Sequence, residues 1–299
     1  MKLSICVITM NRAEQLKEAL ESCLSCILPK KTEFVIIDNA STDDTERTVH
    51  LTLKNAGYSY YYEKLAENLG VGGGRNYAYG KSCGEYAYML DDDAIVDFEN
   101  QPDFFLRAVR YLDENQKIVT LTTQIYDTSW KKNRCSISGP KINDNLYKCL
   151  MFCGGSHFLR KSFYTEAPYL PNKYGYEEIP PSLRAINVGK LNAFCPDLLI
   201  IHKPAINKWN YDDEKNHALL IKGIALPYAI KKMMYPRIFL PILFLAYTRR
   251  FHKYLNMIPN AQKSAKKIIR EISVQCPIDY RIKIRTVIKI FKDFGLSTF

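Results

Sequence analysis

Three consecutive aspartates stand at the end of an apolar run in the first third of the chain. The stretch reads YMLDDDAI over residues 88–95, so Asp91, Asp92 and Asp93 directly follow what looks like a buried strand. Adjacent carboxylates repel one another unless a positive charge lies between them. Carboxylate oxygens suit Mg²⁺ and Mn²⁺, and substrate phosphates can fill the remaining coordination positions. One hypothesis for the triplet is therefore a cation shared with a diphosphate, and the alternative is a solvated turn.

Other carboxylates and one arginine extend this candidate set. Asp38 ends a second apolar run, EFVIID, while Glu177 and Glu178 stand just before two prolines. Arg75 follows the glycines of GVGGG and occupies the place of the third glycine in a dinucleotide fingerprint, so that motif is not matched. We expect instead a glycine-rich turn leading into a short helix, whose N–H groups and Arg75 would bind an anion. A flexible turn with a solvated arginine is the simpler alternative.

The elements that must position these residues alternate along the chain. Four short β-rich runs are the predicted strands: 3–8, 33–38, 58–64 and 85–90. Helical patterns separate them, as where Leu16, Ala19, Leu20 and Cys23 recur at helix spacing. Such alternation predicts an α/β fold with a mostly parallel, Rossmann-like sheet and helices on both faces. Ligands bind at the carboxyl ends of such strands, which is where Asp38 and the aspartate triplet fall.

Composition divides the chain into two parts. The 299 residues are 47% hydrophobic with a net charge of +11, enough for a sizeable core. After residue 200 there are 19 Lys and Arg against 6 Asp and Glu, whereas the first 200 residues hold 23 against 25. A nearly neutral body therefore carries a basic tail. The nine cysteines include one lone CxxC, Cys23 and Cys26, and Met1 is followed by a strand-like run rather than a signal peptide. Both features favour reduced thiols and a cytoplasmic location.

The basic tail, residues 206–299, is predicted to be a helical C-terminal region. Its most apolar run, 238–247, has ten residues, and a membrane span needs about 20, so we expect a buried or interfacial helix. The stretches AQKSAKKIIREI and YRIKIRTVIKIFKDF are basic and amphipathic. They would either pack on the core with a solvated basic face or lie on an anionic membrane surface. We expect the second, which places the protein peripherally on the inner face of the cell membrane.

Six segments, taken together and in order, resemble family 2 nucleotide-sugar glycosyltransferases of the GT-A fold. They are SICVITMNR (4–12), EFVIIDNASTDDT (33–45), ENLGVGGGRNYAYG (67–80), YMLDDDAI (88–95), FCGGSHFLRKSFY (152–164) and YGYEEIPPSLRAINVGKLNAFCPDLLIIHK (174–203). The resemblance covers roughly residues 3 to 205 and implies a GT-A catalytic domain over 1–205. It also implies a nucleotide-diphosphate sugar as donor and Mn²⁺ or Mg²⁺ as cofactor.

The resemblance assigns expected roles residue by residue at the donor site. The nucleotide-sugar contacts would be Thr9, Asn11, Arg12, Asp38, Arg75, Asp91 and Asp92. The aspartate triplet stands at the family's D-x-D motif, where Asp93 would bind the metal directly. Asp92 would contact the ribose or a metal-bound water, and Asp91 either the metal or the donor. His202 stands where some relatives supply another metal or phosphate contact, although a histidine after a strand is often structural.

The resemblance also implies an inverting reaction with a general base opposite the departing diphosphate. The segment GYEEIPPSLR places Glu178 at the base position and Glu177 as its orienting neighbour or an acceptor contact. Gly154 and Gly155 would lie beneath the acceptor. Two departures from the family pattern stand out, because Glu178 replaces the customary aspartate and Pro180-Pro181 replaces an acidic, helical stretch. A solvated turn before a helix is the alternative for both glutamates.

The resulting functional hypothesis is sugar transfer from a UDP- or dTDP-linked donor to a hydroxyl acceptor, a lipid-linked or cell-surface glycan precursor. A sugar nucleotidyltransferase is one alternative, although TMNRAEQ lacks the glycines that such an enzyme would have after its first strand. A catalytically inactive relative that serves as a scaffold is another. Nucleic-acid binding through the basic tail is not expected, because no recognisable module accompanies it.

Overall fold

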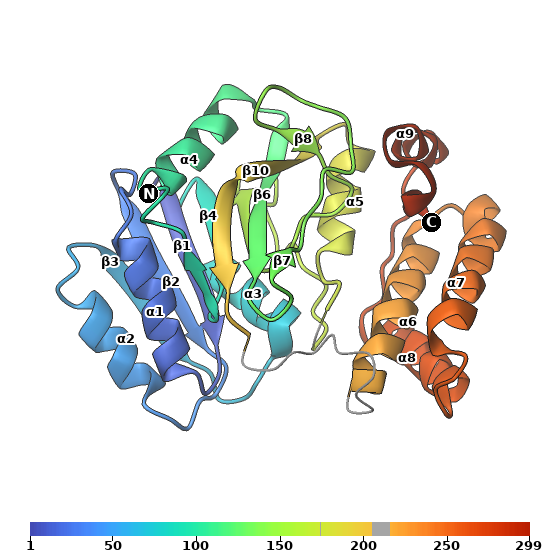
Figure 1. Ribbon diagram of the computed structural model, residues 1–299, viewed down its shortest axis with the longest axis horizontal. Helices are drawn as coiled ribbons and strands as arrows, with labels where there is room; N and C mark the ends of the chain where they lie inside the picture. Colours follow the sequence, from blue (N-terminus) through green and yellow to red (C-terminus); the bar gives the residue numbers. More distant parts are fainter. Residues whose placement is uncertain (174, 205–215) are drawn as a thin grey trace.

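Four parallel strands form the first half of a mixed sheet in the computed structural model, which describes residues 1–173, 175–204 and 216–299 (Figure 1). These strands are β1 (Leu3–Thr9), β2 (Thr32–Asp38), β3 (Ser59–Lys64) and β4 (Tyr86–Asp91), in the spatial order β3-β2-β1-β4. The helices between them are α1 (Ala13–Leu24), α2 (Thr45–Leu53) and α3 (Gly70–Lys81). The register pairs Thr9 with Asp38 and Ile8 with Asp91, so the predicted meeting of strand ends is confirmed.

The second half of the sheet mixes strand directions. Its elements are β5 (Ala94–Val96), α4 (Phe104–Glu114), β6 (Ile118–Asp127), β7 (Lys132–Asn133), β8 (Tyr147–Lys148), β9 (Ser156–Arg160), α5 (Ile179–Asn187) and β10 (Leu191–His202). The spatial order continues β4-β9-β6-β10-β5. β9 runs antiparallel to both β4 and β6, whereas β10 runs parallel to β6. The carboxyl ends of β6 and β10 therefore reach the same edge of the sheet as those of β1 and β4.

Helices cover both faces of this sheet, as the sequence predicted. One core cluster packs α1, α2 and α4 against the sheet, with Leu16, Val49 and Phe105 fully buried. The other packs α3 and α5 on the opposite face through Tyr79 and Ala185. Because helices cover both faces of the sheet, the strand sequences are continuously apolar and do not alternate between apolar and polar residues.

The glycine-rich stretch differs from the sequence expectation, because α3 begins at Gly70 itself and no glycine-rich turn precedes it. A Cβ atom at Gly72 would overlap the carbonyl oxygen of Leu170, and one at Gly74 would lie 2.9 Å from the side-chain amide of Asn39. The glycines thus let the helix approach the 170–173 segment and the loop after β2 closely. Tertiary contact explains Gly72 and Gly74, whereas Gly70 has φ 74°, a backbone conformation that favours glycine.

The C-terminal region folds as a helical bundle with its own core. It comprises α6 (His217–Met234), η2 (Arg237–Phe239), α7 (Leu240–Leu255), α8 (Ala261–Gln275), α9 (Ile284–Phe294) and η3 (Gly295–Thr298). The helices lie to one side of the sheet, next to α5 (Figure 1). No helix in the described part of the chain combines the length and the apolarity required to span a bilayer. The predicted boundary between residues 205 and 206 lies outside the described residues.

Side-chain contacts hold the bundle to the α/β region. The Tyr176 hydroxyl donates a hydrogen bond to the Gly223 carbonyl oxygen (3.1 Å), and the Tyr280 hydroxyl donates one to the Pro180 carbonyl oxygen (3.2 Å). Within the bundle, the Lys231 ammonium donates to the Thr298 carbonyl oxygen at 3.1 Å. Burial and then the nearby charge of Arg250 lower the pKa of Lys231 to about 8.

Candidate active site

A cleft of about 680 Å³ opens at the carboxyl ends of the strands. Its floor carries the aspartate triplet at the end of β4, and β1 and β10 contribute Thr9 and His202. The segment before β9 supplies Gly154 and Gly155, and the turn before α5 supplies the glutamate pair. Helix α6 forms part of the wall through Leu219, Lys222, Gly223 and Leu226. The basic C-terminal region thus helps to build the cleft.

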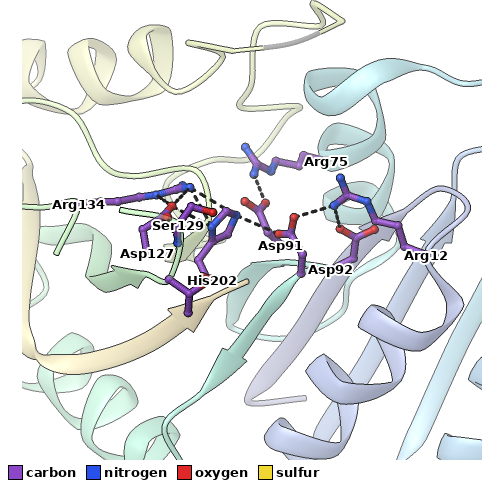
Figure 2. Close-up of polar contacts among 10 residues, drawn as sticks. Arg12, Arg75, Asp91, Asp92, Asp127, Ser129, Arg134 and His202 are labelled. Atoms are coloured by element: carbon purple, nitrogen blue, oxygen red, sulfur yellow. Dashed lines mark hydrogen bonds and ion pairs between the residues drawn. The ribbon is translucent and has the colours of Figure 1, made fainter. Parts of the chain in front are cut away.

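Two arginine side chains, Arg12 and Arg75, contact the three aspartates (Figure 2). Arg12 Nη1 lies 2.8 Å from Asp92 Oδ1 and 2.8 Å from Asp93 Oδ2. The Thr9 hydroxyl donates a hydrogen bond to Asp92 Oδ2 at 2.8 Å. Burial raises the pKa of Asp92 to about 6, although Arg12 and Thr9 favour its charged form. Arg12 therefore relieves part of the repulsion within the triplet.

Asp91, Asp93 and His202 can direct one ligand atom each toward a common point, because these atoms lie within 4.8 Å of one another. His202 Nε2 is 3.1 Å from Asp93 Oδ1, while its Nδ1 is 3.1 Å from Asp127 Oδ2. In the tautomer that carries the ring proton on Nδ1, Asp127 accepts a hydrogen bond from it and the Nε2 lone pair is left for a cation. Two carboxylates and one imidazole suit Mn²⁺ or Mg²⁺, so the donor set fits the expected metal. The three metal ligands expected from the sequence are the residues that this edge of the sheet brings together.

Arg134 and Asp127 are part of the site although the sequence analysis did not select them. Arg134 Nε donates to Asp127 Oδ2 at 2.8 Å, and Arg134 Nη2 lies 2.9 Å from His202 Nδ1 (Figure 2). Although burial opposes it, hydrogen bonding by Arg134 lowers the pKa of Asp127. Asp127 ends β6 at the same edge as Asp91, so a strand-end search extended to residues 118–127 would have found it.

The glutamate pair lies at the start of α5 and is joined to the triplet through Arg75. Arg75 Nη1 is 2.5 Å from Glu177 Oε1 and 3.6 Å from Glu178 Oε1, and Arg75 Nη2 is 2.7 Å from Asp91 Oδ1. Arg75 itself is only 4% exposed. Burial, and then the charge of Glu177, raise the pKa of Glu178 well above its ordinary value. Arg75 was predicted to contact the nucleotide or its phosphates, and in this structure its guanidinium contacts three carboxylates.

Gly154 and Gly155 lie close to both carboxylate groups. A Cβ atom at Gly154 would overlap Glu178 Oε1 and come within 2.7 Å of Arg75 Nη1. One at Gly155 would lie 3.0 Å from Asp91 Oδ2. The Asp91 backbone N–H also donates to the Gly155 carbonyl oxygen at 3.1 Å. Both glycines therefore allow the glutamate pair and the aspartates to approach the same piece of backbone.

Asp38 and Asn11 shape loops beside the cleft rather than its lining. Asp38 is buried and accepts hydrogen bonds from the Ser41 N–H (2.7 Å) and the Tyr62 hydroxyl (2.9 Å). Asn11 has φ 53° and accepts a hydrogen bond from the Thr42 N–H at 2.7 Å. Among the described residues, Asn39, which follows Asp38 in the chain, lines the cleft instead. The nucleotide contacts expected of Asp38 and Asn11 stay predictions.

A mixed α/β sheet with a candidate metal site at its strand ends and a helical extension is the architecture of GT-A glycosyltransferases. Two solved structures share it at low sequence identity. TarS 1-349 from S. aureus, in complex with UDP-GlcNAc, has a TM-score of 0.65 and 15% identity, over 100% of this chain and 89% of that one. The mannosyltransferase PcManGT from Pyrobaculum calidifontis, in complex with GDP-Man and Mn²⁺, has a TM-score of 0.61 and 18% identity, over 93% and 76%.

The sequence model of Glycosyl transferase family 2 matches residues 4–166, and the chain belongs to this family. It is therefore a glycosyltransferase by class. An uncharacterized protein of Haemophilus influenzae is 26% identical over 56% of this chain and 92% of its own length. Poly(ribitol-phosphate) beta-glucosyltransferase of Bacillus spizizenii is 29% identical over 40% of this chain. The GalNAc(5)-diNAcBac-PP-undecaprenol beta-1,3-glucosyltransferase of Campylobacter jejuni is 32% identical over 31% of it. The matches span only 19% and 29% of those two enzymes.

Proposed function

We propose that this protein transfers a sugar from a nucleotide-diphosphate donor, UDP- or dTDP-linked, to an acceptor hydroxyl with inversion at the anomeric carbon. The observation that carries the proposal is the backbone at Gly154 and Gly155. Gly154 approaches Glu178 Oε1 and Gly155 approaches Asp91 Oδ2 of the candidate metal site, so both carboxylates lie against one short stretch of backbone. A direct displacement needs a base near the acceptor and positive charge near the leaving group, and these two residues would supply one part of each.

Asp91, Asp93 and His202 would hold Mn²⁺ or Mg²⁺, which when bound neutralises the charge that develops on the departing diphosphate. Glu178 would accept the proton of the acceptor hydroxyl as its oxygen bonds to the anomeric carbon. Its raised pKa makes it a stronger base than an exposed carboxylate. Glu177, held by Arg75 at 2.5 Å, would orient Glu178 and keep a fixed negative charge beside it.

The acceptor is proposed to be a glycan or a lipid-linked glycan precursor. The Bacillus and Campylobacter relatives are named for a ribitol-phosphate polymer and an undecaprenol-linked acceptor, which supports this class. Lys173 of the cleft wall and Lys222 of α6 add positive charge on the side of the cleft that carries Tyr176 and Leu226. An acceptor with an anionic phosphate and an apolar part would suit such a wall.

Calorimetry with a panel of nucleotide sugars, with and without Mn²⁺, tests the donor and metal assignments. We expect one donor to bind more tightly with Mn²⁺ and Asp93→Ala to remove that gain. Glu178→Gln should keep donor binding and lose transfer, measured as release of the nucleoside diphosphate. Glu166→Gln, at an exposed glutamate, is the matched control. Donor binding that is indifferent to Mn²⁺ and to Asp93→Ala contradicts the metal site, and turnover by Glu178→Gln would transfer the base role to Glu177.

A further inference from the structure

Helix α9 presents three distinct faces. Val287 and Ile290 are buried against the bundle. A second apolar stripe, Ile284, Ile288 and Phe291, recurs at helix spacing, yet its side chains are 46% to 51% exposed. The helix thus carries more apolar surface than its packing covers. Scattered exposed apolar residues are ordinary, but a stripe along one helix face indicates a contact surface.

A row of cations borders this stripe. Arg285, Lys289 and Lys292 are all exposed and are spaced so that they share one side of α9. Asp293, the acidic residue nearest to them in the chain, forms an ion pair with Lys148 at 2.9 Å. Among the described residues, no carboxylate forms an ion pair with the three cations. Their charge is therefore available to an anionic partner.

Neighbouring segments extend the apolar surface. Leu296 of η3 is 77% exposed and Ile238 of η2 is 71% exposed. The buried Phe299 ring packs near Phe291 of α9 and Phe239 of η2, with its centroid 6.1 Å from each ring. The sequence from Arg237 to Leu255 contains no acidic residue. Exposed apolar residues therefore also occur in the segments that neighbour α9, together with further basic sequence.

We propose that the surface formed by Ile284, Ile288, Phe291 and Leu296 with the Arg285, Lys289 and Lys292 row docks on an anionic phospholipid bilayer. Half-exposed apolar side chains would enter the boundary between headgroups and acyl chains, as in interfacial amphipathic helices. The cations would remain at the level of the anionic headgroups. A second copy of this chain fits less well, because its surface has the same positive charge. The proposal is independent of the sugar transferred, and its test needs no turnover.

Flotation of the full-length protein with phosphatidylcholine vesicles, with and without phosphatidylglycerol, tests this surface. We expect binding only when phosphatidylglycerol is present. Arg285→Gln/Lys289→Gln/Lys292→Gln should lower the partition coefficient by roughly 100-fold, since each cation near an anionic surface contributes about fivefold. Lys30→Gln/Lys54→Gln/Lys117→Gln removes the same charge from exposed sites on the α/β region and should change binding far less.

A fluorescence variant reports insertion directly. In Leu296→Trp, vesicles with brominated acyl chains should quench the added fluorescence, beyond any quenching of the parent protein. Equal losses in the two triple variants would overturn the proposal, because binding would then follow net charge alone. Equal flotation with neutral vesicles, or a dimer in light scattering that protects residue 296 from quenching, would also overturn it. Normal thermal unfolding of each variant establishes that the fold is intact.

Discussion

Gly154→Ala should separate catalysis from donor binding in this protein. The added Cβ atom would overlap Glu178 Oε1 and lie 2.7 Å from Arg75 Nη1, so the Glu178 carboxylate has to move. Glu178 stands at the N-terminus of α5 and its neighbour Glu177 is fixed by Arg75, so the shift falls mainly on the Glu178 side chain. A base that moves by about 1 Å costs roughly 100-fold in rate.

Steady-state release of the nucleoside diphosphate, measured as kcat and as KM for the donor, tests this expectation. We expect kcat to fall by roughly 100-fold while the donor KM and the calorimetric donor affinity change little. Gly80→Ala is the matched control, because no atom lies within 4 Å of the Cβ position there. An unchanged kcat in Gly154→Ala would refute the placement of the base at Glu178. A loss of donor affinity equal to the loss of kcat would refute the separation of the two sites.

Three further outcomes follow from single contacts. Asp127→Asn should weaken Mn²⁺ binding by about 10- to 100-fold in calorimetry, since Asp127 orients His202. An unchanged Mn²⁺ affinity would contradict the assignment of His202 as a metal ligand. Gly72→Ala should lower the free energy of unfolding, measured in urea, by about 1–3 kcal/mol, because the added Cβ atom would overlap the Leu170 carbonyl oxygen. A stability equal to that of the parent protein would show that α3 can shift at this position. The pKa of Lys231 is about 8 in the folded protein and 10.5 in the unfolded chain. Between pH 8 and pH 10.5 the unfolded state therefore binds more protons than the folded state. Stability should therefore rise with pH across that window, by at most about 3 kcal/mol, and Lys231→Met should flatten the curve.

Local sequence patterns were sufficient for the first half of the fold. The apolar runs that became β1, β2, β3 and β4 are set by burial between two helix layers, and each was predicted within a few residues. Because the carboxyl ends of parallel strands meet at one edge, the approach of Asp92 and Asp93 to Thr9 and Arg12 also follows from local signals. The resemblance to family 2 added the roles of His202 and of the glutamate pair.

Contacts between distant segments could not be predicted in the same way. Arg75 and Glu177 are 102 residues apart in sequence, and nothing near Arg75 indicates that its partners are carboxylates rather than phosphates. The glycine-rich stretch was predicted to be a turn, because the close approach of Leu170 to Gly72 and of Asn39 to Gly74 cannot be read from the local pattern. The part of α6 in the cleft wall was missed for the same reason.

The sequence by itself determined the strand–helix alternation, the edge at which the acids gather and the basic amphipathic character of the C-terminal region. These properties depend on residue types within one or two turns of helix or one strand. Only the tertiary structure decided which charges neutralise one another, which helix closes the cleft and which stripe of α9 remains exposed. Each of those depends on a packing partner far along the chain, because a charged or apolar side chain acquires its role from whatever the fold places against it.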